Sequence, residues 1–563
     1  MKFSEMPYRR PTLEELRNEY GRITAEFSRS NSADEQYRLI LAHEKLTGDF
    51  DTLASIAYIR NSINTTDPFY EAEMAFFDAN SPVVNSYRQD FYRAVAASPF
   101  RTELEQRAGR LFFVNLELAL KSSSPETVDL QKKENALVTE YEKLLASAKI
   151  DFHGETLNLS EMQKHTISPN RPERKEAWTK IAGFFTENAK RLDEIYGELV
   201  KNRTEQAHRL GYKNYVQLGY DRLGRNCYGP EEVAAYRRQI VRDLVPMISR
   251  LKAKQAGRLG LPGIRFWDDG CLFPDGNPAP KGGTQKLVDE AQRMYREMNP
   301  LTGKFFDSMK QNELFDLESK KGKAGGGYCT SIPGYQSPFI FSNFNGTAGD
   351  VEVLTHEAGH AFADYVSQDN PILETRCPTM DGAETHSMSM ELFSRPWDRL
   401  FFEEEAEKFH QYQLETALDF IPYGCLVDHF QTEMYEHPEL TPDERKQTWL
   451  KLEHTYRPWI DFGGMPFFST GGGYQRQHHI YSFPLYYIDY CLAQTTALEF
   501  WSASEQDWNG AFSRYLTFVK AGGTKTYVEL VKLAGLELPF RDGCIKKLCG
   551  EISQFLETRQ AKQ

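Results

Sequence analysis

The chain has 563 residues, of which 40% are hydrophobic and 13% aromatic, and its formal net charge is −13. This length exceeds what one hydrophobic core usually supports, so we expect two or more lobes. The hydrophobic content excludes wholesale disorder. The acidic balance argues against nucleic acid as a partner, because nucleic-acid binding needs clustered Lys and Arg.

Membrane and redox signals are absent from the sequence. No segment approaches the ~18 apolar residues of a membrane span, and the first twenty residues lack the apolar core of a signal peptide. The eight cysteines are scattered without a C-x-x-C pair, which predicts free thiols in a reducing compartment. We therefore expect a cytoplasmic protein with no membrane partner.

Amphipathic helices dominate the predicted elements. Apolar residues recur every 3–4 positions, opposite charged faces, in three long segments: 33–59, 172–211 and 230–254. Residues 149–163 alternate around a glycine, which predicts a short strand or hairpin. We expect a domain boundary near this stretch, between an N-terminal helical lobe (1–160) and a catalytic part (161–563).

Two later segments interrupt the helical pattern. Residues 262–283 are rich in Pro and Gly and are interpreted as a connector. Residues 325–350 are rich in Gly, Pro and Ser around the strand-like sequence FIFSNFN.

The segment DVEVLTHEAGHAFADYV, residues 350–366, contains the pattern H-E-x-x-H. The spacing of four places His356 and His360 on one face of a helix, one turn apart, where both imidazoles can bind one zinc ion. Glu357 then lies beside the metal, where it can take a proton from a water molecule that the metal activates. Short patterns also arise by chance on solvated helices, but apolar runs on both sides favour a metal site here.

A catalytic zinc needs a third protein ligand. Ala363 and Val366 exclude the extended pattern with a third histidine, so the ligand must come from another element. Glu384 lies 24 residues after His360 within a predicted helix that starts at Asp381 and ends near Pro396. We favour it as the ligand, although D-x-x-E is also a helix-capping pattern.

Several neighbouring residues are rivals for the ligand or suit a supporting role. Glu374, His386 and Glu391 are the rival ligands. Glu391 and Asp364 are also candidates to accept a hydrogen bond from a ligand histidine, although Asp364 can equally be a solvated charge.

The stretch GGGYQRQHHIYSFPLYYIDY, residues 471–490, combines three glycines, two histidines and five tyrosines. It lacks the Lys and Ser/Thr of a phosphate-binding loop. The tyrosines follow a helical stripe that packing alone explains. Alternatively, Tyr and His donors near the metal stabilise the oxyanion of a tetrahedral intermediate, and the residues alone leave both interpretations open.

HEAGHAF, Glu384 with Glu391, and HHIYSFPLYYIDY together resemble the thimet oligopeptidase/oligoendopeptidase F family of zinc metallopeptidases. The likeness is strongest to the bacterial oligoendopeptidase F and Pz-peptidase group. SPNRPERKEAW (168–178) and the block 325–347 also look like members of that group, so the resemblance covers most of the chain after residue 150.

The resemblance implies a mostly α fold, a two-lobed helical bowl with a deep central channel and a small β-sheet beside the H-E-x-x-H helix. It implies one Zn²⁺ per chain held by His356, His360 and Glu384, with Glu357 as the general base. It also implies that His479 and Tyr486 stabilise the oxyanion, with Tyr481, Tyr487 and Tyr490 as neighbouring substrate contacts. In other branches of the family a glycine pair precedes the tyrosine, whereas Ser482, Phe483 and Pro484 occupy that region here.

The resemblance also suggests a role for the FIFSNFN segment. We expect it to be an edge strand that pairs with extended substrate, so that Phe341, Ser342 and Asn343 lie along the peptide. An ordinary small sheet that shields the helix is the alternative.

We therefore predict a cytoplasmic zinc endopeptidase that hydrolyses short unstructured oligopeptides, as a monomer or homodimer. A zinc exopeptidase with the same ligands is a second prediction, in which Arg476 binds a terminal carboxylate. A third is a non-enzymatic scaffold with a structural zinc that Cys377 closes as fourth ligand.

Overall fold

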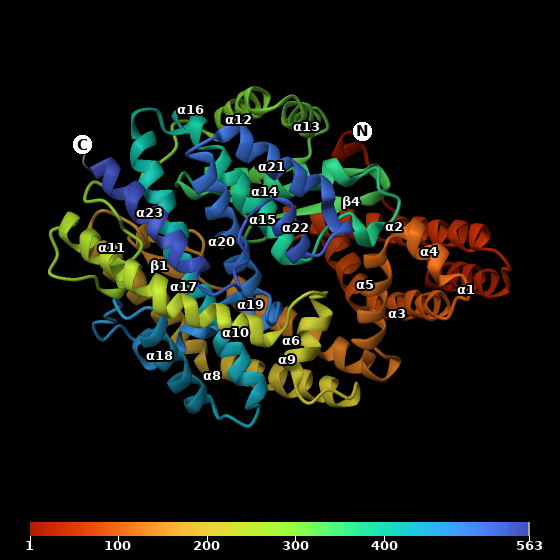
Figure 1. The fold of residues 1–563 in the computed structure, drawn as a ribbon. Coiled ribbons are helices and arrows are strands. Elements are labelled where there is room, and N and C mark those ends of the chain that lie inside the picture. Colours follow the sequence, from red (N-terminus) through yellow and green to blue (C-terminus); the bar gives the residue numbers. More distant parts are fainter. Residues whose placement is uncertain (561–563) are drawn as a thin grey trace.

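Helices make up most of the computed structural model, which describes residues 1–560 (Figure 1). This confirms the prediction of a mostly α fold. Helices α1 to α5, red and orange in Figure 1, gather at one side of the molecule. The N-terminal helices are α1 (Leu13–Arg29), α2 (Ala33–Ile63), α3 (Pro68–Ala96), α4 (Arg101–Ala108), α5 (Arg110–Lys121) and α6 (Val128–Ala146).

A short hairpin follows α6, as the alternating sequence predicted. β1 (Ile150–Phe152) pairs antiparallel with β2 (Glu155–Leu157), and His153 and Gly154 between them both have positive φ. Two such residues form the tight turn that suits the twist of a hairpin. The next helices are α7 (Gln163–Thr166), α8 (Arg171–Arg209), α9 (Tyr215–Arg222), α10 (Pro230–Gln239) and α11 (Val245–Arg258).

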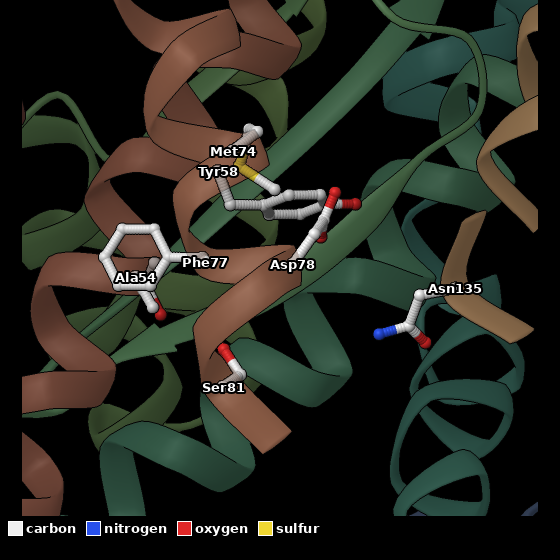
Figure 2. A pocket seen from close by; sticks show the side chains of 8 residues that line it. Ala54, Tyr58, Met74, Phe77, Asp78, Ser81 and Asn135 are labelled. Atoms are coloured by element: carbon white, nitrogen blue, oxygen red, sulfur yellow. The ribbon is translucent and has the colours of Figure 1, made fainter. Parts of the chain in front are cut away.

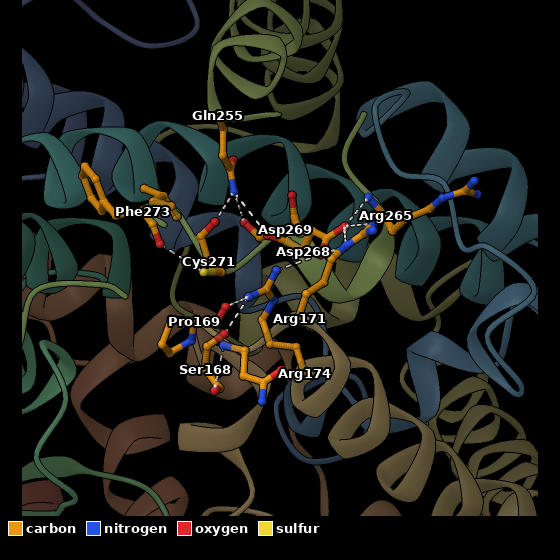
Figure 3. A network of polar contacts seen from close by, with 12 residues as sticks. Ser168, Pro169, Arg171, Arg174, Gln255, Arg265, Asp268, Asp269, Cys271 and Phe273 are labelled. Carbon is orange, nitrogen blue, oxygen red and sulfur yellow. Dashed lines mark hydrogen bonds and ion pairs between the residues drawn. The ribbon is translucent and has the colours of Figure 1, made fainter. Parts of the chain in front are cut away.

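One buried carboxylate fixes the connector at residues 262–283. Arg171 Nη2 and Arg174 Nη2, both in the first turn of α8, lie 2.8 and 2.9 Å from the Asp268 carboxylate (Figure 3). Burial by itself raises the pKa of Asp268, but the two guanidinium groups hold it below its usual range. The network therefore ties the connector to the start of α8.

The second sheet has three strands: β3 (Phe315–Glu318), β4 (Tyr328–Ile332) and β5 (Ser337–Phe344). Their order is β3-β5-β4, with β5 parallel to β3 and antiparallel to β4. The FIFSNFN segment, which belongs to β5, is therefore the central strand. The prediction of an edge strand is wrong, because neighbouring strands already pair with β5 on both sides.

The side chains predicted to lie along the substrate take structural positions instead. Phe341 and Ser342 are buried. Asn343 Nδ2 donates to the carbonyls of Ala324 and Gly326 at 2.8 Å, which holds the preceding loop against the sheet. These three side chains are thus part of the scaffold.

The rest of the chain surrounds two buried helices. Most residues of α15 and α20 are buried, the two helices pack on each other, and α14 and α17 pack against them. The helices of this part are α12 (Thr284–Met298), α13 (Pro300–Gln311), α14 (Gly349–Ser367), α15 (Met380–Phe393), α16 (Arg399–Phe402), α17 (Ala406–Glu436), α18 (Pro442–Tyr456), α19 (His478–Ser482), α20 (Tyr487–Ser504), α21 (Trp508–Ala521), α22 (Tyr527–Leu533) and α23 (Cys544–Gln560).

All eight cysteines are free thiols, in agreement with the sequence prediction. Within residues 1–560, none of the helices combines the length and apolar character needed to cross a membrane.

Candidate metal centre

Three potential metal ligands converge between α14 and α15. His356 Nε2 and His360 Nε2 each lie 3.3 Å from the same oxygen, Glu384 Oε2. The three donor atoms lie within 4.8 Å of one another, and they form the one such His/Cys/Asp/Glu group found in the described residues. Two imidazoles and one carboxylate that share a focus are a donor set that fits a divalent metal ion.

Close contact between the two helices depends on Gly359. A Cβ at this position would lie 2.6 Å from the Cα of Ser387 and 2.8 Å from the carbonyl oxygen of His386. Both distances are too short for any side chain, so only glycine lets α14 approach α15 closely enough for Glu384 to reach both histidines. This glycine stands inside the H-E-x-x-H pattern, but the pattern alone does not indicate its role in helix packing.

The charges at the centre favour a bound cation. Only 3% of Glu384 is exposed. Burial would raise the pKa of Glu384, but His360 and His356 overcome this effect and keep it well below its usual range. Glu384 therefore keeps its negative charge in a buried position, next to two imidazoles that can each be neutral.

Glu391 supports the first histidine, whereas Asp364 does not support the second. Glu391 Oε1 lies 2.6 Å from His356 Nδ1, the ring nitrogen that points away from Glu384. Such a contact fixes the tautomer and ring orientation of a ligand histidine. The Asp364 carboxylate is instead hydrogen-bonded to Ser331 of β4.

The rival ligands lie outside the donor group. Glu374 accepts a hydrogen bond from Tyr92, His386 is enclosed in the core against Phe518, and Cys377 is not among the converging donors of the described residues. These positions do not support the closed structural site considered above.

Glu357 lies next to the ligands on α14. Its side chain is 7% exposed, and no hydrogen bond joins its carboxylate to another described residue. Burial raises the pKa of Glu357, and His356 and His360 act in the opposite direction. A carboxylate that is free of protein partners and is made more basic by its surroundings suits a general base.

Tyr486 reaches the centre from the loop between α19 and α20. Its hydroxyl donates a hydrogen bond to Glu384 Oε1, the oxygen that does not face the histidines. Burial, followed by the charge of Glu384, raises the pKa of Tyr486 well above its usual value. The hydroxyl therefore remains protonated and is a hydrogen-bond donor.

A chain of hydrogen bonds orients His479. Tyr423 donates to Gln477 Oε1 at 2.7 Å, so the Gln477 amide nitrogen donates to His479 Nδ1 at 3.0 Å. This assignment, made from the hydrogen-bond network, leaves the proton on His479 Nε2, which lies 3.5 Å from the hydroxyl of Tyr490. Burial, together with neighbouring His478, lowers the pKa of His479 to about 4. The imidazole is therefore neutral at pH 7 and has one N–H donor.

Residues far away in sequence hold the loop that carries Tyr486. Leu485 is a non-glycine residue with a φ of 66°, a conformation that costs energy. Gln431 Oε1 accepts from the Leu485 N–H at 2.9 Å, and Arg225 Nη2 donates to its carbonyl at 2.6 Å. Arg225 is itself paired with Asp489 at 2.9 Å. No local sequence signal identified Arg225 or Gln431.

The other tyrosines of the segment have separate positions. Tyr481 is fully buried, stacks on Tyr141 at 3.9 Å and donates to the carbonyl of Leu192. The prediction that Tyr481 contacts substrate is therefore wrong, because it is a core residue. Tyr487 and Tyr490 line a cavity of about 400 Å³ next to the centre.

A second cavity, of about 300 Å³, lies where α2 and α3 face α6 (Figure 2). Asp78 of α3 and Asn135 of α6 stand on opposite sides of it. Tyr58 of α2 is at its edge and contacts Tyr328, the first residue of β4, with ring centroids 4.9 Å apart. Tyr58 thus connects this cavity to the first residue of β4.

Two family models and several known proteins match the chain. The peptidase M3 N-terminal domain model matches residues 3–123, and the peptidase family M3 model matches residues 302–549. A solved structure of Pz peptidase A with an inhibitor is 46% identical to the chain, with a TM-score of 0.97 over 99% of both chains.

Two further relatives extend the comparison. A Bacillus anthracis protein described as an oligoendopeptidase F is 43% identical, with a TM-score of 0.92 over 99% of this chain and 98% of that one. The oligopeptidase PepF of Bacillus subtilis is 22% identical over 90% of this chain and 78% of its own length. The chain therefore belongs to peptidase family M3 and is a metallopeptidase, and the converging His356, His360 and Glu384 are its candidate metal ligands.

Proposed function

We propose that this protein is a zinc endopeptidase that hydrolyses internal bonds of short, extended peptides. The observation that carries the proposal is the convergence of His356, His360 and Glu384 on one point beside the unpartnered carboxylate of Glu357. A His₂Glu donor set is typical of catalytic zinc. The names of the relatives, which include an oligoendopeptidase F and an oligopeptidase, support an endopeptidase over an exopeptidase.

His356, His360 and Glu384 would hold the zinc ion, and Glu391 would keep His356 in the ligating orientation. When bound, zinc would act as a Lewis acid that polarises water and the scissile carbonyl. Glu357 takes a proton from the attacking water and then gives it to the nitrogen of the departing amine. Its raised pKa suits both transfers, because a base whose pKa is nearer to neutral also returns its proton readily.

Two side chains from the α19–α20 segment stabilise the negative charge that develops on the oxygen of the scissile carbonyl. The protonated hydroxyl of Tyr486 exchanges its bond to Glu384 for one to the oxyanion, and His479 donates its Nε2–H. Donors of this kind that are already oriented before reaction typically contribute about 3–4 kcal/mol each to transition-state stabilisation.

β4 replaces β5 as the proposed binding strand for the substrate main chain. Among the described strands, β4 pairs only with β5, so its other edge has no strand partner. β4 also packs against α14, which carries Glu357. An extended peptide that pairs with this edge gains affinity from main-chain hydrogen bonds, without a strict requirement on its sequence.

No observation favours the exopeptidase alternative. Arg476, the residue proposed to bind a terminal carboxylate, lies over the ring of Trp178 at 5.1 Å and is exposed. The stacking gives Arg476 a structural partner.

Cleavage of a fluorogenic peptide blocked at both ends tests the proposal. We expect internal cleavage that a chelator abolishes and that one equivalent of zinc restores, with the bound zinc measured by elemental analysis. Cleavage only of peptides with a free terminus would contradict the endopeptidase assignment. Activity that persists after complete removal of metal would contradict the metal centre.

A further inference from the structure

The cavity of about 400 Å³ beside the metal centre is lined by residues of five helices: α14, α15, α17, α19 and α20. Tyr487, Tyr490 and Gln494 of α20 line it, and Phe420 is among the residues of α17 that do so. Positions separated by three, four or seven residues lie on one face of a helix, so α15, α17 and α20 each present a continuous stripe to the cavity. The shape is therefore set by rigid elements.

The cavity opens next to the reacting groups. His479 and Glu391 are both part of its lining, and Glu391 is the partner of the ligand His356. Tyr490, also in the lining, lies 3.5 Å from His479 through its hydroxyl. A peptide at the metal centre can therefore place a side chain close to its scissile bond into this space.

One end of the cavity is aromatic. The ring centroids of Tyr487 and Tyr490 lie 5.7 and 6.2 Å from that of Phe420. Gln413 and Phe420 line the same wall from positions seven residues apart on α17, which corresponds to about 10 Å along the helix axis. This length is enough for an extended side chain of four carbons or more.

The end of the cavity near Gln413 is acidic, since burial and the charge of Glu352 together raise the pKa of Tyr412, the residue before Gln413. Glu352 of α14 lines it, no hydrogen bond or ion pair joins its carboxylate to another described residue, and no Lys or Arg is in the lining. Burial, with Glu391 and Asp398 nearby, raises the pKa of Glu352 to about 8. Glu352 is half-buried, and a carboxyl group with no partner in a cavity lined mostly by apolar side chains is a favourable site for a cation that enters it.

We propose that this cavity is a specificity pocket for a lysine or arginine side chain next to the scissile bond, with Glu352 as the acceptor of its charged head. The apolar stem of such a side chain packs along Phe420 and Tyr487 while the head pairs with the carboxylate. A purely apolar side chain would fill the aromatic end but would leave Glu352 unpaired. This inference rests on the proposed endopeptidase function.

The test compares doubly blocked peptides that differ at one residue flanking the scissile bond: lysine, arginine, norleucine or glutamate. In the unaltered enzyme we expect kcat/KM for the lysine peptide to exceed that for the norleucine peptide at least tenfold, with the glutamate peptide the poorest. Glu352→Gln should reduce the lysine-to-norleucine ratio to near unity, with bound zinc and the melting temperature measured alongside.

Two further variants keep the test decisive. Asp78→Asn removes an acid from the other cavity (Figure 2) and should leave the lysine-to-norleucine ratio unchanged. Ala417→Phe should fill the pocket and lower kcat/KM for lysine, arginine and norleucine peptides much more than for an alanine peptide. If Glu352→Gln fails to fold, Ala417→Phe still tests whether the cavity receives the side chain.

The outcomes distinguish a failure of the specificity pocket from a failure of the proposed endopeptidase function. Equal cleavage of lysine and norleucine peptides, or the same change in ratio for Asp78→Asn and Glu352→Gln, would overturn the specificity pocket alone. Absence of internal cleavage for every peptide, with zinc bound, would overturn the proposed function and the pocket with it.

Discussion

The two sides of the metal centre are held by different kinds of contact. On one side, adjacent turns of α14 present His356 and His360, and Gly359 lets α15 bring Glu384 into contact with them. On the other side, Tyr486 follows Leu485, whose unfavourable φ is maintained by hydrogen bonds to Gln431 and Arg225. The ligand side depends on helical periodicity, whereas the donor side depends on tertiary contacts. We therefore expect the donor side to be the more sensitive to changes outside the centre.

The largest expected effect is on the ligand side. Glu357→Gln removes the proposed base, so we expect kcat to fall about 10³-fold or more while bound metal stays at one equivalent. The measurement is single-turnover cleavage together with metal analysis. Near-normal turnover in this variant would refute the role of Glu357.

The next largest effect concerns the hydrogen bond from Tyr486 to Glu384, where the two sides meet. Tyr486→Phe should lower kcat about 10²–10³-fold with little change in KM, because it removes one oriented donor. The same hydroxyl also bonds to Glu384, so the assay is repeated with excess zinc. Recovery of kcat in excess zinc would mean that Tyr486 only supports the ligand.

A change outside the centre tests the claim about sensitivity. Gln431→Leu leaves the buried N–H of Leu485 without an acceptor, and we expect kcat to fall roughly tenfold as Tyr486 shifts. The matched control is Asp268→Asn, which weakens the buried network of Figure 3. The control should lower the melting temperature by a similar amount with kcat retained. Equal losses of kcat in the two variants would contradict the claim that catalysis depends on the support of Leu485 in particular.

The smallest effect concerns a carboxyl pair in the segment between the ligand helices. Glu374 is hydrogen-bonded to Glu44 of α2 and receives a hydrogen bond from Tyr92. Burial, with Glu44 nearby, raises the pKa of Glu374 to about 8. Between the ordinary pKa of a glutamate and about 8, the native state keeps this proton but the unfolded chain does not. The free energy of unfolding therefore falls as the pH rises toward 8.

Glu374→Gln removes this penalty, and its amide can still donate to Glu44 and accept from Tyr92. We expect the melting temperature to rise roughly 1–3 °C at pH 9, with a smaller change at pH 5. Thermal melts across this pH range check the sign. A variant that is equally destabilised at both values would show that the pair does not ionise as described.

Some features followed directly from local sequence. The 3.6-residue period predicted the segments that form α2, α8 and the α10–α11 pair, and the glycine turn predicted the β1–β2 hairpin. The spacing of His356 and His360 predicted their common face, and the start signal at Asp381 with the stop near Pro396 placed Glu384 on the next helix. Each of these predictions depends on geometry that repeats within about one or two turns of backbone.

Other features were decided by tertiary structure. Tyr481 and Tyr486 lie five residues apart in one aromatic stretch, yet Tyr481 is stacked in the core and Tyr486 contacts the ligand Glu384. The strand-like FIFSNFN segment is central rather than at the edge, because β3 and β4 arrive from both sides. Likewise, only the folded chain places Glu352 in a cavity that residues of five helices line.

The physical reason for this division is the range of the interactions. The sequence by itself determined helices, the hairpin and the shared face of the histidines, because backbone hydrogen bonds and side-chain periodicity act over a few residues. Strand order and the burial of one tyrosine over another depend on which elements meet in the folded chain. The support of Leu485 by Gln431 and Arg225 joins residues that are 54 and 260 positions apart. Only the folded chain brings such partners together.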